Sequence, residues 1–359
     1  MILTPKHISF ETHTHRVSMG NLCGTPGDTN TPPGPPPTKP SSPGRSTTTP
    51  QNLKVYTLTE LKKATKNFRA DGMVGEGGFG RVFKGWVDEV TYQPSKVGVG
   101  IPVAVKISEL HSLNHPHRWK DEMEFLGKFS HPNVVKLIGY CCEQKQFLLV
   151  YEFMQKGSLD KHLFRRGPEL LSWETRIKLA IGVARSLTFL HTSKNVIYRN
   201  IKTSSILLDG NLNPKLSDFG LVVTMGPSNG NTHVSTDVYG SYGYLAPEYI
   251  ATGHLYTKSD VYGFGMVLLE LLTGLRAVDR NRPRESQNLV RWAQPSLSSK
   301  KKIKKLIDPR LGDDYSPKGA WATVELILKC LQSEPGKRPY MEEVLVVLEK
   351  VGSLKDRPK

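Results

Sequence analysis

Apolar and polar positions change their period along the chain, and this change separates predicted strands from predicted helices. Residues 81–85 alternate between apolar and polar, while Ile101–Lys106 and Phe147–Met154 are short apolar runs, so we expect three strands. Residues 176–191 instead place apolar side chains on one face of a helix. The stretch Ser259–Leu272 is apolar on all sides, which predicts a helix in the centre of a lobe, capped at Ser259–Val261.

Two further segments have helical spacing, and one has no periodicity. Thr59–Thr65 and Arg118–Phe129 are the predicted helices, whereas residues 1–50 are rich in Pro, Thr, Ser and Gly and cannot build a core. We therefore expect a disordered tail over 1–50, an extension helix over 51–67, a first lobe over 68–153, a second lobe over 154–350 and a short tail over 351–359.

Length and composition limit the class of protein. The 359 residues, 38% of them apolar, suffice for a sizeable core, and we see no apolar run of the eighteen or more residues that a membrane span requires. The first residues lack the order of a secretory signal. The four cysteines form neither a disulfide framework nor a metal-binding spacing, so we expect a soluble or lipid-anchored protein in the reducing cytosol.

The net charge of +16 predicts attraction to phosphates of some kind. We find no zinc-finger spacing, RNA-binding aromatic motif or basic-region helix, so we expect no nucleic-acid partner. An anionic membrane surface is the simpler partner, particularly for the basic run Lys300–Lys305, although that run is also compatible with a plain solvated face.

The tail contains one candidate anchor. From Met19 the sequence Met-Gly-Asn-Leu-Cys is similar to an N-myristoylation start, with Gly20 as the acceptor and Cys23 as a palmitoylation site. One myristoyl chain binds membranes only marginally, so the thiol and the basic surface would provide the second signal. This hypothesis requires translation from Met19, and the alternatives are a chance Met-Gly pair and a start at Met1.

A glycine-rich hairpin follows the extension. Glycines there let backbone N–H groups approach phosphates, and Phe79 folds over them. A dinucleotide-binding turn also uses such glycines, but it requires a helix immediately afterwards, and residues 81–85 have the pattern of a strand. The predicted nucleotide-contacting residues of this hairpin are Gly75, Glu76, Gly77, Gly78, Phe79, Gly80 and Val82.

A lysine and a carboxylate follow at characteristic positions. Ala104 and Lys106 belong to a Val-Ala-Val-Lys strand, which brings Lys106 to the α and β phosphates of a nucleotide. In the next helix Glu122 is the expected partner of Lys106, and Glu124 is the competing choice. Beyond the buried strand that follows, the connector at Tyr151, Glu152 and Met154 offers its backbone to an adenine edge.

The motifs occur in one order over residues 68–350, and the chain resembles the eukaryotic protein kinases. Residues 218–220 are Asp-Phe-Gly, residues 246–248 are Ala-Pro-Glu, and Val196–Asp209 has the layout of a kinase catalytic loop. The stretches L-T-E-L-K-K-A-T-K-N-F, H-P-N-V-V-K-L-I-G-Y-C and H-V-S-T-D-V-Y-G-S-Y-G-Y-L-A-P-E-Y are more specifically similar to plant receptor-like cytoplasmic kinases of the immune-receptor-associated subfamily.

The resemblance implies an α+β fold with two lobes: an antiparallel sheet plus one helix, then a mainly helical lobe. It implies ATP and Mg²⁺ as cofactors, with Asp218 as a metal ligand. It also implies serine/threonine kinase activity at the cytoplasmic face of the plasma membrane, and partners among receptor kinases, related cytoplasmic kinases, immune receptors or pathogen effectors. Ser235 and Thr236 would be phosphorylated by a receptor kinase, Arg338 would pair with Glu248, and Asp260 is a structural residue.

Two residues of the catalytic loop depart from the family pattern. Asn200 replaces the aspartate that accepts the proton of the substrate hydroxyl, and Ser205 replaces the asparagine that holds a second Mg²⁺. Arg199 and Lys202 are retained, the first able to meet a phosphorylated loop and the second able to meet the γ-phosphate. We therefore expect a pseudokinase that binds ATP and acts as a scaffold, a decoy or an allosteric partner. The alternative is a weakly or fully active serine/threonine kinase.

Overall fold

The computed structural model describes residues 53–77, 80–108, 118–165, 167, 170–226, 233–297 and 299–354, with the side chains of Lys300 and Lys301 excepted. The predictions for residues 1–50, which include Gly20 and Cys23, lie outside these ranges. Those for Gly78 and Phe79 do as well.

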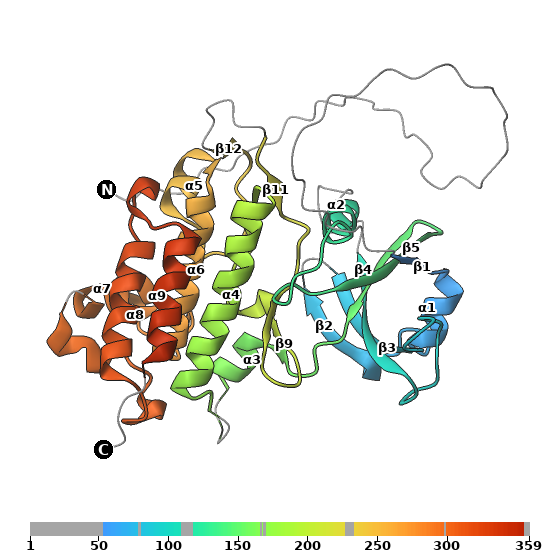
Figure 1. Cartoon of the computed structure of the whole chain (residues 1–359), viewed down its shortest axis with the longest axis horizontal. Helices are drawn as coiled ribbons and strands as arrows, with labels where there is room; N and C mark the ends of the chain where they lie inside the picture. Colours follow the sequence, from blue (N-terminus) through green and yellow to red (C-terminus); the bar gives the residue numbers. More distant parts are fainter. Residues whose placement is uncertain are drawn as a thin grey trace, which may run out of the picture. The chain divides into compact units, whose positions relative to one another are not determined.

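A six-stranded sheet forms the first lobe, with strand order β1-β5-β6-β4-β3-β2 (Figure 1). Its neighbouring strands are antiparallel except that β1 runs parallel to β5 at the edge. This two-residue edge strand was not predicted. The strands are β1 (Lys54–Val55), β2 (Met73–Gly77), β3 (Gly80–Val87), β4 (Ile101–Ser108), β5 (Leu137–Glu143) and β6 (Gln146–Glu152).

Two helices accompany this sheet. Helix α1 (Leu58–Ala64) begins at a capping box in which Thr57 and Glu60 exchange side-chain and backbone hydrogen bonds. Its apolar positions Leu58, Leu61 and Ala64 are buried because they recur at helical spacing on one face. Helix α2 (Arg118–Leu126) buries Glu122 and Leu126, and a 3₁₀ turn, η1 (Ala70–Gly72), precedes β2.

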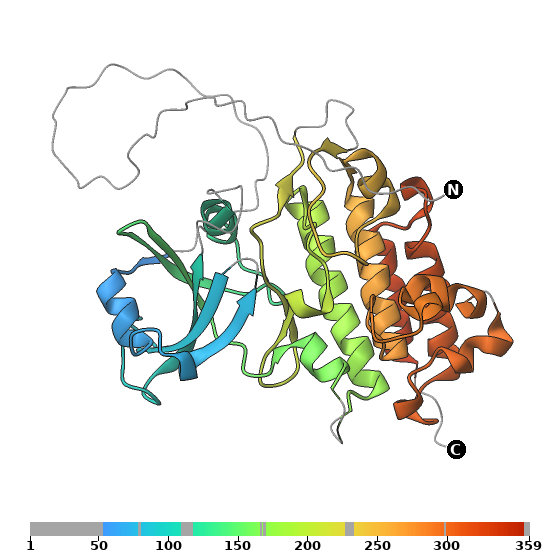
Figure 2. The ribbon, with the colours of Figure 1, turned by 180° about the vertical axis from the view of Figure 1, so that it is seen from behind.

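The second lobe is mainly helical (Figure 2). It surrounds α6 (Thr257–Thr273), whose residues from Ser259 onward are almost all buried. Helix α4 (Trp173–Ser193) packs against α9 (Met341–Ser353), and α6 packs against α8 (Pro317–Cys330). The remaining helices are α3 (Leu159–Leu163), α5 (Pro247–Thr252) and α7 (Leu289–Leu297), with 3₁₀ turns η2 (Thr203–Ser205), η3 (Arg284–Ser286), η4 (Lys300–Lys305), η5 (Pro309–Leu311) and η6 (Pro335–Lys337).

Short strand pairs fix the loops of this lobe. Strands β7 (Gly157–Ser158), β9 (Ile206–Leu208) and β10 (Pro214–Leu216) form one small sheet, and β8 (Val196–Ile197) pairs with β11 (Val223–Thr224). Strand β12 (Val234–Ser235) pairs antiparallel with β13 (His254–Leu255). The expected α+β fold with two lobes is thereby confirmed.

The start of α6 differs from the prediction. The helix begins at Thr257, so Ser259 lies in its first turn and contributes to the cap by accepting a hydrogen bond from the backbone N–H of Tyr256 at 3.1 Å. Asp260 does not cap the helix. Asp260 is a buried residue of the first turns of α6, and its carboxylate accepts a hydrogen bond from the loop after β8.

Within the described ranges, no helix combines the length and the apolar content needed to span a membrane.

Candidate active site

A cavity of about 630 Å³ is lined by residues from both lobes, and its size is typical of a small-molecule site. Lys106 lines this cavity. So do eleven other residues for which we predicted a contact with nucleotide, with metal or with Lys106: Gly75, Glu76, Gly77, Gly80, Val82, Ala104, Glu122, Tyr151, Glu152, Met154 and Asp218. The structure therefore brings together side chains and backbone from five separate stretches of the sequence.

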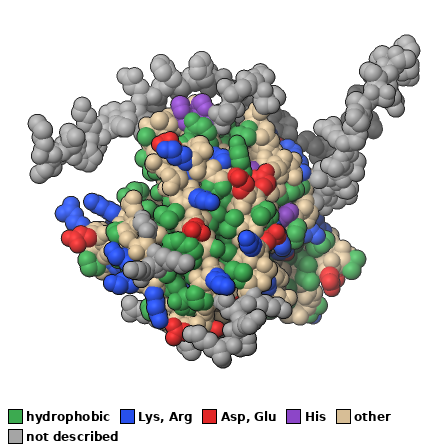
Figure 3. Space-filling model, turned by 60° about the vertical axis from the view of Figure 1, so that its left-hand side comes forward, with side chains coloured by type: hydrophobic (Ala, Val, Ile, Leu, Met, Phe, Trp, Pro, Cys, Tyr) green, Lys and Arg blue, Asp and Glu red, His purple; other side chains and the backbone are tan. Residues whose placement is uncertain are grey.

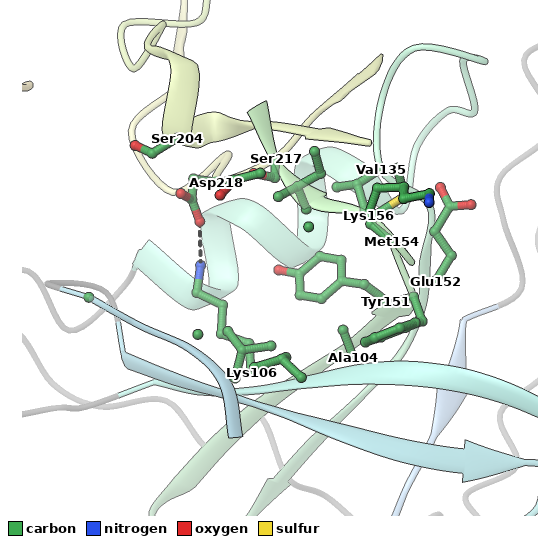
Figure 4. Close-up of a pocket in the computed structure, with 18 of the residues that line it drawn as sticks. Ala104, Lys106, Val135, Tyr151, Glu152, Met154, Lys156, Ser204, Ser217 and Asp218 are labelled. Carbon is green, nitrogen blue, oxygen red and sulfur yellow. Dashed lines mark hydrogen bonds and ion pairs between the residues drawn. The ribbon is translucent and has the colours of Figure 1, made fainter. Parts of the chain in front are cut away.

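Lys106 lies at one end of this cavity and faces two carboxylates. Its Nζ is 2.9 Å from Oε2 of Glu122 and 3.5 Å from Oδ1 of Asp218, and Figure 4 shows the contact with Asp218. Burial alone lowers the pKa of Lys106, but the two carboxylates outweigh burial and raise the pKa above its usual range. Lys106 is therefore a fixed cation at a site shaped for an anion.

Glu122, and not Glu124, contacts the lysine. Glu124 instead pairs with Lys120 on the exposed side of α2 at 3.6 Å. The second oxygen of Glu122 accepts a hydrogen bond from the backbone N–H of Phe219 at 3.1 Å. One buried carboxylate thus links α2 both to the strand that carries Lys106 and to the loop that carries Asp218.

Aromatic packing holds Asp218 in position. The ring of Phe219, which is fully buried, stacks on Phe125 of α2 and meets Tyr198 edge-on at 5.2 Å between centroids. The hydroxyl of Tyr198 also donates to the carbonyl of Ser217. Asp218 itself has φ of +58°, a conformation that non-glycine residues rarely adopt and that the surrounding contacts must impose.

Asp260 positions the catalytic loop through hydrogen bonds to the loop's backbone. Its carboxylate accepts hydrogen bonds from the backbone N–H groups of Tyr198 and Arg199, each at 2.7 Å, and contacts Nε2 of His191 at 2.9 Å. Arg199 has φ of +68°. A buried carboxylate that accepts backbone hydrogen bonds can hold a strained loop in place, so Asp260 is a positioning residue of the site.

Asn200 follows in this loop and is almost fully buried, with 3% exposure. Within the part of the chain that the structure describes, its amide nitrogen has no hydrogen-bond partner. The neighbouring Lys202 donates to the hydroxyl of Ser241 at 3.0 Å and so connects the catalytic loop to the segment before α5. An amide therefore lies where the family pattern has a carboxylate.

Ser205 is fully buried and does not appear among the residues that line the cavity, while its neighbour Ser204 does. Figure 4 shows the Ser204 side chain beside Asp218. Within the described ranges the hydroxyl of Ser205 has no hydrogen-bond partner. We did not predict a role for Ser204, because sequence position alone does not show which of two adjacent serines faces the cavity.

The connector between the lobes lies at the other end of the cavity. The carboxylate of Glu152 accepts from the backbone N–H of Lys136 and pairs with Nζ of Lys215, both at 2.7 Å. The Glu152 side chain is thus used to join the lobes. The carbonyl of Met154 accepts from the N–H of Gly157 at 3.0 Å, which forms the turn that leads into α3.

Tyr151 is buried, and burial, with the carboxylates of Glu122 and Asp218 nearby, raises its pKa well above its usual range.

The predicted structural pair and the predicted phosphorylation sites lie in the segment after Asp218. Nη2 of Arg338 is 2.5 Å from Oε2 of Glu248, and the guanidinium is fully buried. Ser235 is exposed, whereas Thr236 is half-buried with its hydroxyl 3.2 Å from Nη2 of Arg199.

Comparison with known proteins identifies the family. The family described as protein tyrosine and serine/threonine kinase matches residues 68–348. The chain belongs to the protein kinases. It is 54% identical to the Arabidopsis thaliana "Probable serine/threonine-protein kinase PBL10" over 308 residues, which is 85% of this chain and 74% of that relative. It is 53% identical to "Receptor-like cytoplasmic kinase 176" of Oryza sativa subsp. japonica over 310 residues, 85% of this chain and 78% of that protein. Within the kinases it is therefore of the receptor-like cytoplasmic type.

Protein kinases use ATP and Mg²⁺. The metal ion neutralises the charge that develops on the transferred phosphoryl group. The cavity of this kinase fits these groups in part. Lys106 offers a cation for phosphate oxygens, and Asp218 offers the carboxylate oxygens that Mg²⁺ prefers. The position of the second metal ligand is occupied by Ser205, whose hydroxyl is buried away from the cavity.

Proposed function

We propose that this protein is a kinase-fold signalling protein that binds ATP but transfers its γ-phosphate slowly or not at all. The observation that carries the proposal is the side chain at position 200: Asn200 is buried in the catalytic loop, and its neutral amide cannot take a proton from a substrate hydroxyl. Loss of a positioned base typically lowers a rate by about 10²–10⁴-fold.

The assembled nucleotide site supports ATP binding. Lys106, Glu122 and Asp218 lie within contact distance of one another, and the lysine is fixed before any ligand arrives. Because its side chains already hold this geometry, binding requires little reorganisation. We expect weaker Mg²⁺ binding than in kinases with the usual asparagine, since Ser205 contributes no oxygen to the lining of the cavity.

An active serine/threonine kinase is the second candidate, and the same geometry favours it. The buried Lys106–Glu122 pair is the arrangement that protein kinases require for transfer. Phosphoryl transfer depends mainly on positioning and electrostatics, so residual turnover with Asn200 in place is physically allowed. The losses at Asn200 and Ser205 act on one step and are not independent.

Within this proposal the protein works through binding, as a scaffold, a decoy for a pathogen enzyme or an allosteric partner of another kinase. The names of its relatives, among them "Receptor-like cytoplasmic kinase 176", support receptor kinases or related cytoplasmic kinases as partners. We propose immune receptors as a further class of partner. Phosphorylation at Ser235 and Thr236 would then control which partner binds.

We also propose that the protein works at the cytoplasmic face of the plasma membrane. Lipid chains at Gly20 and Cys23, if translation starts at Met19, would combine with exposed lysines of η4 such as Lys302 and Lys305. The face drawn in Figure 3 shows Lys and Arg side chains interspersed with acidic and hydrophobic ones, so surface charge there is mixed. Fractionation of cells that express the Met19 start, with and without Gly20→Ala, tests the anchor; a soluble Met19 product contradicts it.

Two assays on the purified protein test the proposed function. We expect ATP with Mg²⁺ to raise the thermal unfolding midpoint of the wild type and to have less effect on Lys106→Met, which keeps a similar volume but loses the cation. We expect little or no autophosphorylation of the wild type. Strong autophosphorylation that Lys106→Met abolishes would establish the active-kinase alternative, and no ATP shift at all would favour pure scaffolding.

A further inference from the structure

The two candidate phosphate acceptors face opposite sides of the β12–β13 ladder. Ser235 pairs with His254 across the ladder, and Val234 pairs with Leu255. Side chains alternate along a strand, and residues directly opposite one another share a face. Ser235 therefore lies on the face of His254, and Thr236 lies on the other face.

Two histidines and a tyrosine form a cluster on the face of Ser235. The ring of His233, two residues before Ser235, is 4.2 Å from the ring of His254 and 5.3 Å from that of Tyr256, measured between centroids. Both histidines are half-buried and Ser235 is exposed. Directly opposite residues have Cβ atoms about 4.5–5.5 Å apart, so a group added to Ser235 is within reach of the imidazole of His254.

Thr236 meets a different cation. Its hydroxyl lies 3.2 Å from Nη2 of Arg199, which also donates to the carbonyl of Asp237 and to the hydroxyl of Tyr249. The backbone N–H of Thr236 is held by the carbonyl of Gly253 at 3.0 Å. A phosphate on Thr236 would thus be placed against a guanidinium that is charged at every physiological pH.

We propose that a phosphate on Ser235 has a site of its own, formed by His254 and His233 and separate from the contact that Arg199 makes with Thr236. The inference rests on the proposed phosphorylation of the segment. Phosphate oxygens are strong acceptors, and each imidazole offers at least one N–H donor. A phosphate on Ser235 therefore meets imidazole donors, whereas a phosphate on Thr236 meets a guanidinium.

In the described part of the chain, other titratable side chains also lie near the Ser235 site. Besides His233 and His254, Tyr256 packs against the cluster, and Asp237 follows two residues after Ser235, on the same side of an extended chain. The carboxylate of Asp237 opposes a nearby phosphate, so the histidines are the groups that stabilise it. Lys258, at the start of α6, points away and donates to the carbonyl of Arg338 at 2.6 Å.

The test uses full-length protein with phosphoserine installed at one position during synthesis, so that its outcome does not depend on kinase activity or on ATP. Phosphorus NMR then measures the second pKa of the phosphate. At position 235 we expect that pKa to lie below the free value of about 6, and His254→Gln with His233→Gln to raise it by on the order of one unit.

Two controls decide the assignment. Phosphoserine at position 236 should titrate identically with and without the histidine substitutions, and Arg199→Gln should affect that phosphate alone. The unphosphorylated double histidine variant should keep the thermal midpoint of the wild type, which separates loss of the site from misfolding. A phosphate at position 235 that is insensitive to both histidines, or sensitive to Arg199→Gln, overturns the proposal. Failure of the ATP-binding assay would leave this result unaffected.

Discussion

The carboxylate of Glu122 lies 2.9 Å from the ammonium of Lys106, and both groups are buried. The partner oxygen of the same carboxylate holds the backbone of Phe219. A single side chain thus couples α2 to two parts of the nucleotide site, and its position in the cavity wall is the reason why we expect ATP to bind without rearrangement of the lobes.

The first prediction concerns this carboxylate. Glu122→Gln removes the charge that fixes Lys106, so we expect ATP affinity to fall by about tenfold, equivalent to about 1.4 kcal/mol. Glu124→Gln, in the same helix but exposed and paired with half-buried Lys120, is the matched control and should leave affinity unchanged. Titration calorimetry with ATP and Mg²⁺ measures both. Equal affinities for the two variants would show that Glu122 does not act on the nucleotide.

The second prediction concerns the buried ion pair between Glu248 and Arg338. Arg338→Leu leaves the carboxylate of Glu248 without its guanidinium, and we expect the free energy of unfolding to fall by about 3–5 kcal/mol. Arg185→Leu breaks an exposed pair with Glu349 at 2.8 Å and should cost less than about 1 kcal/mol. Urea unfolding compares the variants. Similar losses for both would mean that burial does not determine the effect.

The third prediction concerns pH. Glu270 is fully buried in α6, where burial raises its pKa to about 7 despite hydrogen bonds from Tyr244 and from the backbone of Ala277. The folded state then binds the proton more tightly than the unfolded state. Protonated Glu270 therefore contributes fully to the free energy of unfolding at pH values below the unfolded-state pKa of about 4.3. This contribution is lost as the pH rises through about 7.

Glu270→Gln isolates that contribution. The wild-type free energy of unfolding should decrease between pH 5 and pH 7 by at most about 1.4 kcal/mol per pH unit from this group, and the variant, which is neutral throughout, should lack that decrease. Denaturant titrations at several pH values measure the slope. Identical slopes in the two proteins would place the pKa of Glu270 outside this range.

From the spacing of motifs we could predict which residues line the cavity, but less well which contacts those residues make. Lys106 and Asp218 are 112 positions apart, yet each belongs to a motif whose neighbours in sequence limit its place in the fold. The choice between Glu122 and Glu124 followed from distance along the chain, and the structure places Glu122 against Lys106 because that face of α2 turns toward the sheet.

Other features depended on contacts that local sequence does not specify. Asp260 has the pattern of a helix cap, but its carboxylate holds the backbone of a loop about 60 residues earlier in the chain. Ser204 and Ser205 are adjacent and chemically identical, and the local turn of η2 decides which one faces the cavity. Strand β1 has two residues, too few for a periodic signal.

The central claim is that an amide at position 200 prevents efficient phosphoryl transfer while ATP still binds. The most direct measurement compares phosphate incorporation from ATP into one basic protein substrate by the wild type and by the Asn200→Asp, Ser205→Asn double variant, after both have been shown to share a thermal midpoint. We predict a rate about 10²–10⁴-fold higher for the double variant. Equal rates for the two proteins would contradict the claim, and equal rates accompanied by strong incorporation would identify an active kinase.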